Sequence, residues 1–267
     1  MKLNWTIAVI MLWICVALAS VFFNHHADAI DLDHILSTPN LQALLGNDDL
    51  GRDVLARLMV GAQTALTVAL LVSIITLSFG TAVGLIAGYF GGWVDRLLMQ
   101  ITDVFLAFPG ILLAIAFAAV LGPGLNNLLL ALCLTSWVGY ARLTRAQALA
   151  LRHRQHVLAA QALGASVPRI MFKHMLPLLL APLVVEATYS IAGLVIAEAS
   201  LSFLGLGIQA PHASWGGMLR DGVRYLLIAP HYVLAVGVSL MSLVLAVNVL
   251  GDQLRDAWDV KRNNADR

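Results

Sequence analysis

Apolar stretches without charges, separated by short polar segments, fill most of this chain. A helix needs about 20 apolar residues to cross the hydrocarbon core of a membrane. The stretches predict six such spans, at Trp5–Phe23, Ala62–Tyr89, Phe105–Leu121, Leu128–Leu143, Leu178–Ala199 and Tyr232–Leu250. We therefore expect an all-α integral membrane protein with six transmembrane helices.

The third and fourth spans come from one long run, because no charge occurs from Val104 to Ala141. A single helix over that run would be about 57 Å long, nearly twice the thickness of the hydrocarbon core. The segment Leu121–Asn127 reads Leu-Gly-Pro-Gly-Leu-Asn-Asn, and its turn residues predict a break between two spans.

Lysine and arginine placement predicts the orientation, since cytoplasmic segments carry an excess of both. Six spans put both termini on one side, and of the 16 basic residues only Arg52, Arg57, Arg220 and Arg224 then fall outside. Both termini are therefore expected to be cytoplasmic. A cleaved signal peptide ending near Ala17-Leu-Ala19 is the alternative, but the apolar run exceeds the usual 7–15 residues of its apolar region.

Composition supports the membrane class, with 60% hydrophobic and 12% charged residues against about 25% charged in soluble domains. A net charge of +1 gives no reason to expect a nucleic-acid partner. Cys15 and Cys133 lie inside apolar runs, so we expect buried thiols and no disulfide framework.

The predicted spans divide the chain into segments. We expect an N-terminal transmembrane helix at 1–24, an outside loop at 25–61 and a five-helix core at 62–252. The core includes an inside loop at 144–177 and an outside loop at 201–230, and residues 253–267 form an inside tail. In the first outside loop, Asp48 or Asp49 could cap an amphipathic helix that bears Leu55 and Leu58 on one face.

The basic inside loop predicts an elbow of two helices. Gln155–Leu163 consists of good helix formers and is followed by Gly164, a typical helix end. Ser166 can cap a second short helix, and Pro177 then marks the start of the fifth span. Ile170, Met171 and Phe172 form an apolar flank. This flank favours a docking surface at the membrane face over a loop that merely anchors the topology.

Two acids lie within the fifth span, where a charge costs about 2.5–3.5 kcal/mol and should face protein or water. Glu186 could line a pathway as acceptor for a substrate amine or cation, or be a buried structural acid. Glu198 could brace an outer gate or loop. His25, His26 and His34 form no recognised metal site, and we expect no metal to be bound. The chain also lacks a Gly-Lys-Ser/Thr nucleotide-binding loop. If it carries out ATP-driven work, a partner protein must therefore hydrolyse the ATP.

Several segments together resemble the permease subunits of the dipeptide, oligopeptide and nickel ABC importers. The loop signature of that family stands here as Leu158-Ala159-Ala160, Gly164 and Leu176-Pro177. Further matching segments cover nearly the whole chain from Leu44 to Asp259, at Leu50–Val54, Gly88–Asp95, Trp137–Arg142, Ala197–Gly207 and Asn248–Asp256.

The resemblance implies the ABC type I importer permease fold with a cytoplasmic coupling-helix loop, in the bacterial inner membrane. It implies a homologous permease, two ABC ATPase subunits and a periplasmic or extracellular solute-binding protein as partners. ATP and Mg would be bound by the ATPases, so this chain would bind no cofactor and have no catalytic residue. The implied ATPase-coupling residues are Leu158, Ala159, Ala160, Gly164, Ala165, Ser166, Arg169, Phe172, His174 and Pro177.

One residue departs from the signature, because Leu158 replaces its glutamate. Docking would then depend more on packing than on a charge, unless Arg152 and Arg154 compensate. Di- or oligopeptides are the expected cargo, and nickel or a metal chelate is the alternative. An ion-coupled secondary transporter and a structural membrane protein are more distant alternatives.

Overall fold

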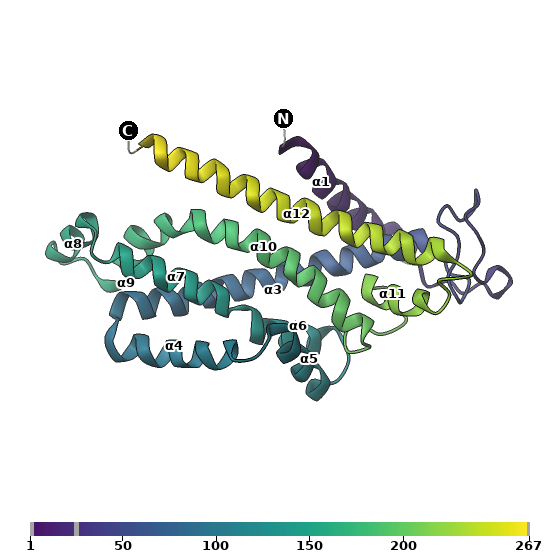
Figure 1. Cartoon of the computed structure of the whole chain (residues 1–267), viewed down its shortest axis with the longest axis horizontal. Helices are drawn as coiled ribbons and strands as arrows, with labels where there is room; N and C mark the ends of the chain where they lie inside the picture. The colour runs from purple at the N-terminus through teal and green to yellow at the C-terminus, as the bar shows by residue number, and fades with distance from the viewer. Residues whose placement is uncertain (1–2, 24–26, 266–267) are drawn as a thin grey trace. The chain divides into compact units, whose positions relative to one another are not determined.

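The computed structural model describes residues 3–23 and 27–265, with side chains from Trp5 to Trp258. Within these ranges the regular structure is helical, apart from one isolated bridge between Asn47 and Asp53 (Figure 1). The principal helices are α1 Leu3–Ala19, α3 Val54–Phe90, α4 Gly92–Leu106, α5 Gly110–Leu121, α6 Leu125–Ser136, α7 Val138–Leu151, α8 Gln155–Ala162, α9 Val167–Arg169, α10 Leu176–Phe203, α11 Trp215–Val223 and α12 Pro230–Ala265.

Four helical stretches of the described chain are long and apolar enough to cross a membrane. They are Trp5–Phe22, Val54–Phe90, Val167–Phe203 and Pro230–Trp258. The bent pair α4 and α5 is a fifth candidate, with 83° between its two helices. The all-α membrane class is therefore confirmed, but these criteria do not give the six spans that we expected.

The missing spans have a local cause. The expected span Phe105–Leu121 is wrong as one helix, because α4 ends at Leu106 and α5 begins only at Gly110. Pro109 lies in this gap, and proline disfavours helical backbone at the residue before it. The expected span Leu128–Leu143 is likewise interrupted, at Trp137 between α6 and α7.

The predicted break at Leu121–Asn127 is confirmed. Gly122 and Gly124 both have positive φ angles, of 86° and 131°. The side-chain amide of Asn127 donates to the carbonyl oxygens of Leu121 at 2.7 Å and Gly122 at 3.2 Å. The amide thereby satisfies carbonyl groups at the end of α5, which would otherwise lack partners.

The chain folds as two compact units. The first unit comprises Met1–Leu71, Ile115–Leu132 and Ile191–Leu250, and the second comprises Val72–Ala114, Cys133–Ser190 and Gly251–Arg267.

Trp215 on α11 is the centre of the first unit and is fully buried. Its indole N–H donates to the Leu58 carbonyl on α3 at 3.0 Å, and its ring packs edge-on against Trp13 of α1 at 5.1 Å. The Trp13 indole in turn donates to Ser242 on α12 at 2.9 Å. Two tryptophans therefore join four helices of this unit, and both polar N–H groups are satisfied.

In the second unit, three glycines let α3 pack directly on the backbone of α7. Gly80, Gly84 and Gly88 recur every four residues and therefore share one face of α3. A Cβ atom at these positions would overlap α7, at the carbonyl oxygens of Trp137 and Ala141 and at the Ala148 side chain. Such rows of small residues are typical of close helix pairs in membranes.

We expect Gly84→Ala to destabilise the subunit by about 1–3 kcal/mol, because the added methyl group would overlap the Ala141 carbonyl and the Thr144 side chain. Helix propensity alone would make alanine stabilising by about 1 kcal/mol relative to glycine. A loss of stability would therefore show that steric overlap with α7 outweighs propensity. Gly237→Ala on α12 is the matched control, since no atom lies within 4 Å of its Cβ position. Denaturation in detergent measures both, and equal stability of the two variants would contradict the packing argument.

Candidate functional site

The predicted elbow joins α7 to the long α10 through α8, Gly164 and α9. Gly164 has a φ of 76°, which strongly favours glycine. The N–H of Gly164 donates to Gln161 and the N–H of Ala165 donates to Ala160, at 2.9 and 3.0 Å. This pair of hydrogen bonds is a Schellman motif. It satisfies the carbonyls of Gln161 and Ala160, and α8 ends before Gly164, as the sequence predicts.

Two details of the elbow differ from the sequence prediction. Ser166 occupies the N-cap position, but its hydroxyl accepts no capping hydrogen bond. Pro177 lies in the first turn of α10, as the sequence predicts, but helical backbone runs without a break from Val167 into this helix. A π-helical turn at Ile170–Met175 precedes Pro177. Its wider spacing leaves room for the proline ring, which would clash with a carbonyl in a regular α-helix.

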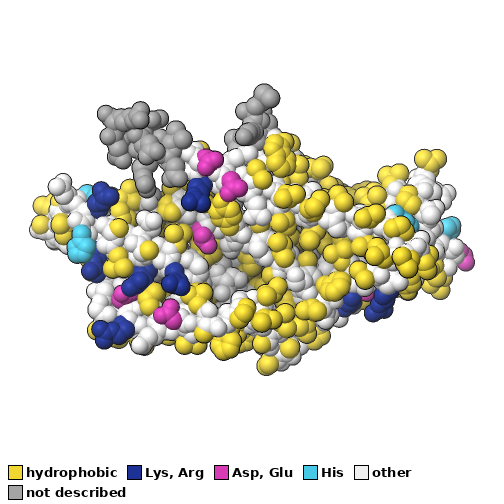
Figure 2. Space-filling view, viewed as in Figure 1, with side chains coloured by type: hydrophobic (Ala, Val, Ile, Leu, Met, Phe, Trp, Pro, Cys, Tyr) yellow, Lys and Arg dark blue, Asp and Glu magenta, His cyan; other side chains and the backbone are white. Residues whose placement is uncertain are grey.

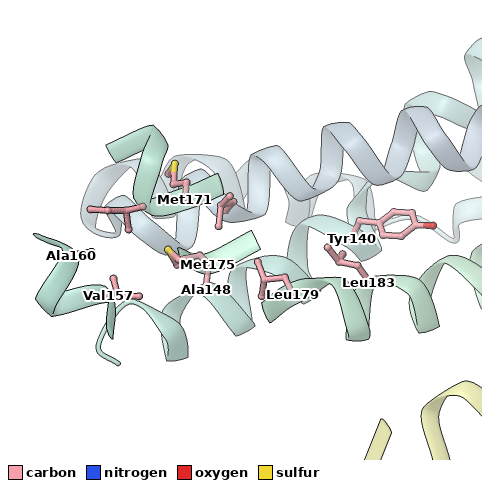
Figure 3. Packing of buried hydrophobic residues seen from close by; sticks show 10 residues of the cluster. Tyr140, Ala148, Val157, Ala160, Met171, Met175, Leu179 and Leu183 are labelled. Atoms are coloured by element: carbon pink, nitrogen blue, oxygen red, sulfur yellow. The ribbon is translucent and has the colours of Figure 1, made fainter. Parts of the chain in front are cut away.

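One side of the elbow is part of the core of the second unit (Figure 3). Val157 and Ala160 of α8 belong to the same buried cluster as Ile170, Met171 and Met175 of the π-turn. Ala148 on α7 and Leu179 and Leu183 on α10 complete this contact. The elbow is therefore packed onto the unit through α8 at one end and through the π-turn at the other.

The opposite side of the elbow exposes large apolar side chains. Leu158 is 48% exposed, Phe172 66% and Leu163 87%. The expected apolar flank is only partly free, because Ile170 and Met171 are buried and Phe172 alone of the three is exposed. Sequence reasoning missed Leu163 as a surface residue, although its position beside Gly164 at a helix end was a usable signal.

The remaining predicted coupling residues lie on or near the same elbow. Ala159, Ser166, Arg169 and Pro177 are exposed, Ala165 and His174 are half-buried, and Ala160 is buried. Lysine and arginine side chains gather over α4, α7 and the elbow on the face that Figure 2 shows.

Arginines of α7 and of the turn after it attach α7 to neighbouring helices. Arg145 donates from Nε and Nη2 to the Asp95 carboxylate on α4. Arg152 reaches the Gly88 carbonyl near the end of α3 at 3.4 Å and donates to His153 at 2.9 Å. Arg152 is thus engaged within the unit, which weakens the idea that it replaces the signature glutamate.

Glu186 lines an open pocket of about 600 Å³ in the second unit, together with Gln147, Tyr189, Arg255 and Trp258. The Tyr189 hydroxyl donates to Asp252 at 2.5 Å. Among the described residues, no hydrogen bond or ion pair to Glu186 is found. A Cβ atom at position 139 would lie 3.2 Å from Glu186 Oε1, so Gly139 leaves space for this carboxylate.

Glu198 is different, because it is fully buried in the first unit. Its Oε1 accepts from the Ser202 hydroxyl at 2.8 Å, and Ser202 Oγ accepts from the Ile208 N–H at 3.3 Å. The carboxylate thereby holds the end of α10 and the segment that follows it. This geometry favours the bracing interpretation of Glu198.

A buried network of ion pairs joins the loop that precedes α3 to the first turn of α3. Asp48 is fully buried and accepts from Arg52 Nε at 2.7 Å, and Arg57 Nε lies 3.4 Å from the same carboxylate oxygen. Arg57 also donates to the Ala27 carbonyl at 3.2 Å. The predicted cap of the helix is wrong, because Asp53, not Asp48 or Asp49, accepts from the Ala56 N–H. Asp48 is instead the counter-charge of two arginines.

The pKa values of two acids in this loop shift in opposite directions. Burial, together with the neighbouring Asp48 and Asp221 charges, raises the pKa of Asp49. A hydrogen bond from His34 and another from the Asp33 N–H lower the pKa of the exposed Asp31.

The sequence predicts that the histidines of the loop before α3 bind no metal ion. Within the described ranges, no cluster of three or more His, Cys, Asp or Glu side chains could hold a metal ion. His34 pairs with Asp31 at 2.8 Å, whereas His25 and His26 lie outside the described residues.

We expect Asp48→Ala to destabilise the subunit by about 3 kcal/mol, because Arg52 and Arg57 then keep only their longer contacts to Asp49 at 3.5 Å and Asp28 at 3.7 Å. Asp33→Ala is the control, since this carboxylate is exposed. Thermal denaturation and limited proteolysis of residues 27–53 provide the measurement. A stable, protease-resistant Asp48→Ala variant would show that the network does not hold the loop.

Comparison with known proteins bears on the whole chain. A model of the protein family described as "binding-protein-dependent transport system inner membrane component" matches residues 80–259. The chain is 45% identical over 226 residues to the dipeptide transport system permease protein DppC of Alkalihalophilus pseudofirmus, covering 85% of this chain and 74% of that relative. It is 41% identical to the glutathione transport system permease protein GsiD of Pectobacterium atrosepticum, covering 86% and 77%.

Among solved structures, the chain is similar in fold to one from the inward-facing MetNI methionine ABC transporter. The TM-score is 0.58 at 24% sequence identity, over 76% of this chain and 95% of that chain.

Proposed function

This chain belongs to the family of binding-protein-dependent transport system inner membrane components, and we propose that it carries di- or oligopeptides across that membrane by alternating access. It is a multi-pass permease subunit of an ABC importer. ATP hydrolysis in such transporters occurs in separate ATPase subunits, which bind the nucleotide, and a binding protein delivers the solute.

The observation that carries the peptide proposal is the 45% identity to a permease named for dipeptide transport, over 85% of the chain. The second relative is named for glutathione, itself a tripeptide. Both names favour peptides over the nickel alternative. Uptake of labelled dipeptide, glutathione and nickel by the reconstituted importer tests the cargo, and uptake of nickel alone would overturn it.

The finer arrangement is part of the same proposal. The subunit would cross the membrane six times, with the bent α4–α5 pair and the interrupted α6–α7 pair each as one crossing. Both termini and the elbow would then be cytoplasmic. A homologous permease would complete the pathway, and each permease would contact one of two ATPases.

The elbow would be the contact with the ATPase. Its buried side is fixed to α7 and α10, and its free side presents Leu158, Leu163 and Phe172. Burial of an exposed leucine or phenylalanine contributes about 1.5–3 kcal/mol, enough to make these three side chains the main anchors. Such apolar anchors would let the loop dock without the signature glutamate.

We expect the double variant Leu163→Ser, Phe172→Ser to lose ATPase subunits during detergent purification and to lower uptake more than tenfold. The reason is loss of two exposed apolar anchors, while the buried side of the elbow stays intact. Leu158→Glu removes one apolar anchor but restores the signature acid, so it should lose less ATPase than the double variant does. Normal copurification of the double variant would place the contact elsewhere.

Glu186 is proposed to line the pathway and accept the ammonium group of the peptide. Its open pocket and its lack of a described partner support this role over that of a structural acid. A carboxylate without a partner in a span is expected to face water or a ligand.

We expect Glu186→Gln to reduce peptide uptake by tenfold or more at unchanged assembly, because the amide keeps the shape but loses the charge. Gln147→Asn in the same pocket is the control and should have a smaller effect. Uptake and the amount of assembled complex are measured together. Unchanged transport by the assembled Glu186→Gln importer would exclude the pathway role.

A further inference from the structure

An apolar groove of about 460 Å³ runs along the second unit between α3 and the elbow end of α10. We call it the α3–α10 groove. On each side, its wall is a row of side chains spaced four residues apart. These rows are Ser78, Ala82 and Ile86 on α3 and Leu176, Leu180 and Val184 on α10. The buried residues Leu85, Met171 and Leu183 form the floor, and Figure 3 labels the last two.

The length of the groove matches one leaflet of a membrane. Both helices are long and apolar enough to cross a bilayer. On the α10 side the lining extends from Phe172 to Val184, a separation of twelve residues, or about 18 Å of helix at about 1.5 Å per residue. One leaflet contributes about 15 Å to a hydrocarbon core of about 30 Å. The groove therefore extends from the elbow to roughly the middle of the membrane.

Two basic side chains lie at the elbow end of the groove. Arg169 precedes Phe172 by three residues, and Lys173 precedes Leu176 by three, so each is a neighbour of a lining residue on the helix surface. Both are exposed, and among the described residues neither side chain has an ion pair or hydrogen bond. Helix α3 and residues 104–185 contain no aspartate or glutamate. These two positive charges are therefore free to bind an anion.

The groove suits an apolar chain better than a polar ligand. Ser78 and Thr81 are the only polar side chains in its lining, and the Ser78 hydroxyl donates to the Ile74 carbonyl of its own helix at 2.7 Å. A helix of a partner subunit could fill the groove by shape, but it would leave both cations unpaired unless it carried an acid. A phospholipid supplies an apolar chain and an anionic phosphate in one molecule, and basic pockets between membrane helices typically bind such headgroups.

We propose that the α3–α10 groove holds an acyl chain of an anionic phospholipid whose phosphate binds Arg169 and Lys173. Long basic side chains near the ends of membrane helices extend to the level of the headgroups, where the phosphate lies. The bound chain covers Met171 and Leu183 from the membrane side, at the place where the elbow joins α10. This inference goes beyond the proposed function, since it needs the membrane class of the chain but no particular cargo.

The test measures phosphatidylglycerol bound to the complete importer by native mass spectrometry, which also reports the subunits present. We expect Arg169→Gln combined with Lys173→Gln to weaken this binding about thirtyfold, as the loss of two basic contacts to an anionic lipid predicts. Phosphatidylcholine, which has no net charge, should bind equally to the variant and the wild type. Arg96→Gln combined with Arg154→Gln is the matched control, because it removes two other exposed arginines of the same unit and should not weaken binding.

A second variant tests the groove itself. Ala82→Trp places a large ring among the lining residues, so it should weaken phosphatidylglycerol binding about tenfold although both cations remain. Ile75→Trp is the control on the same helix, because Ile75 is 51% exposed and does not line the groove.

The lipid site would be overturned if the paired charge variant and Ala82→Trp bound phosphatidylglycerol as wild type does. Loss of the homologous permease from Ala82→Trp, with lipid binding retained, would also overturn it and assign the groove to a helix of that subunit. Glycerol phosphate carries the same anion without an acyl chain. Displacement of the lipid by an equal concentration of it would show an anion site that does not use the groove.

Discussion

The close approach of α3 to α7 is the contact on which the second unit depends. Backbone groups in a membrane must be satisfied within the protein, so helices there associate by shape and by polar contacts. Gly80, Gly84 and Gly88 bring α3 against the backbone and Cβ atoms of α7. Arg152, in the turn after α7, donates to the Gly88 carbonyl of α3, and Arg145 of α7 pairs with Asp95 on α4. Only three residues separate the end of α7 from the start of the elbow at Gln155, so the position of the elbow depends on the α3–α7 helix pair.

The first unit solves a different problem, that of ordering a long loop with little apolar core. A single buried carboxylate, Asp48, pairs with two arginines, and its Oδ1 also accepts from the N–H groups of Leu50 and Arg52. Buried charges are tolerated only when they are paired and hydrogen-bonded in this way. Within the loop this polar network takes the place of an apolar core, and several leucines and isoleucines of the loop lie at the surface.

Local signals in the sequence predicted the local structure well. Gly122-Pro123-Gly124 gave the break before α6, and Gly164 gave the end of α8, because these positions need backbone that glycine favours. The burial of Ile170 and Met171 could not be read from the loop alone, since it depends on α7 and α10 packing against them. The bend at Pro109 was predictable in principle. The Gly80, Gly84 and Gly88 spacing was also visible, but its partner helix was not.

The candidate site divides in the same way. The sequence pattern of the loop predicted which residues form the elbow. It could not predict that Phe172 is exposed while Ile170 and Met171 are buried, because this depends on how the unit packs. The choice between Asp48, Asp49 and Asp53 as helix cap depended on which carboxylate the arginines recruit. Several carboxylates and arginines lie within ten residues of one another here, and the folded loop decides which of them pair.

The π-turn at Ile170–Met175 has a consequence for the helix that follows it. A π-turn holds one residue more than an α-turn, and each residue of an α-helix rotates the chain by about 100°. Every side chain of α10 after this point is therefore turned by roughly that angle from where an unbroken α-helix would place it. The extra residue therefore sets the rotational register of α10. Deleting one residue in the π-turn would turn Glu186 away from its pocket and Leu179 away from the core.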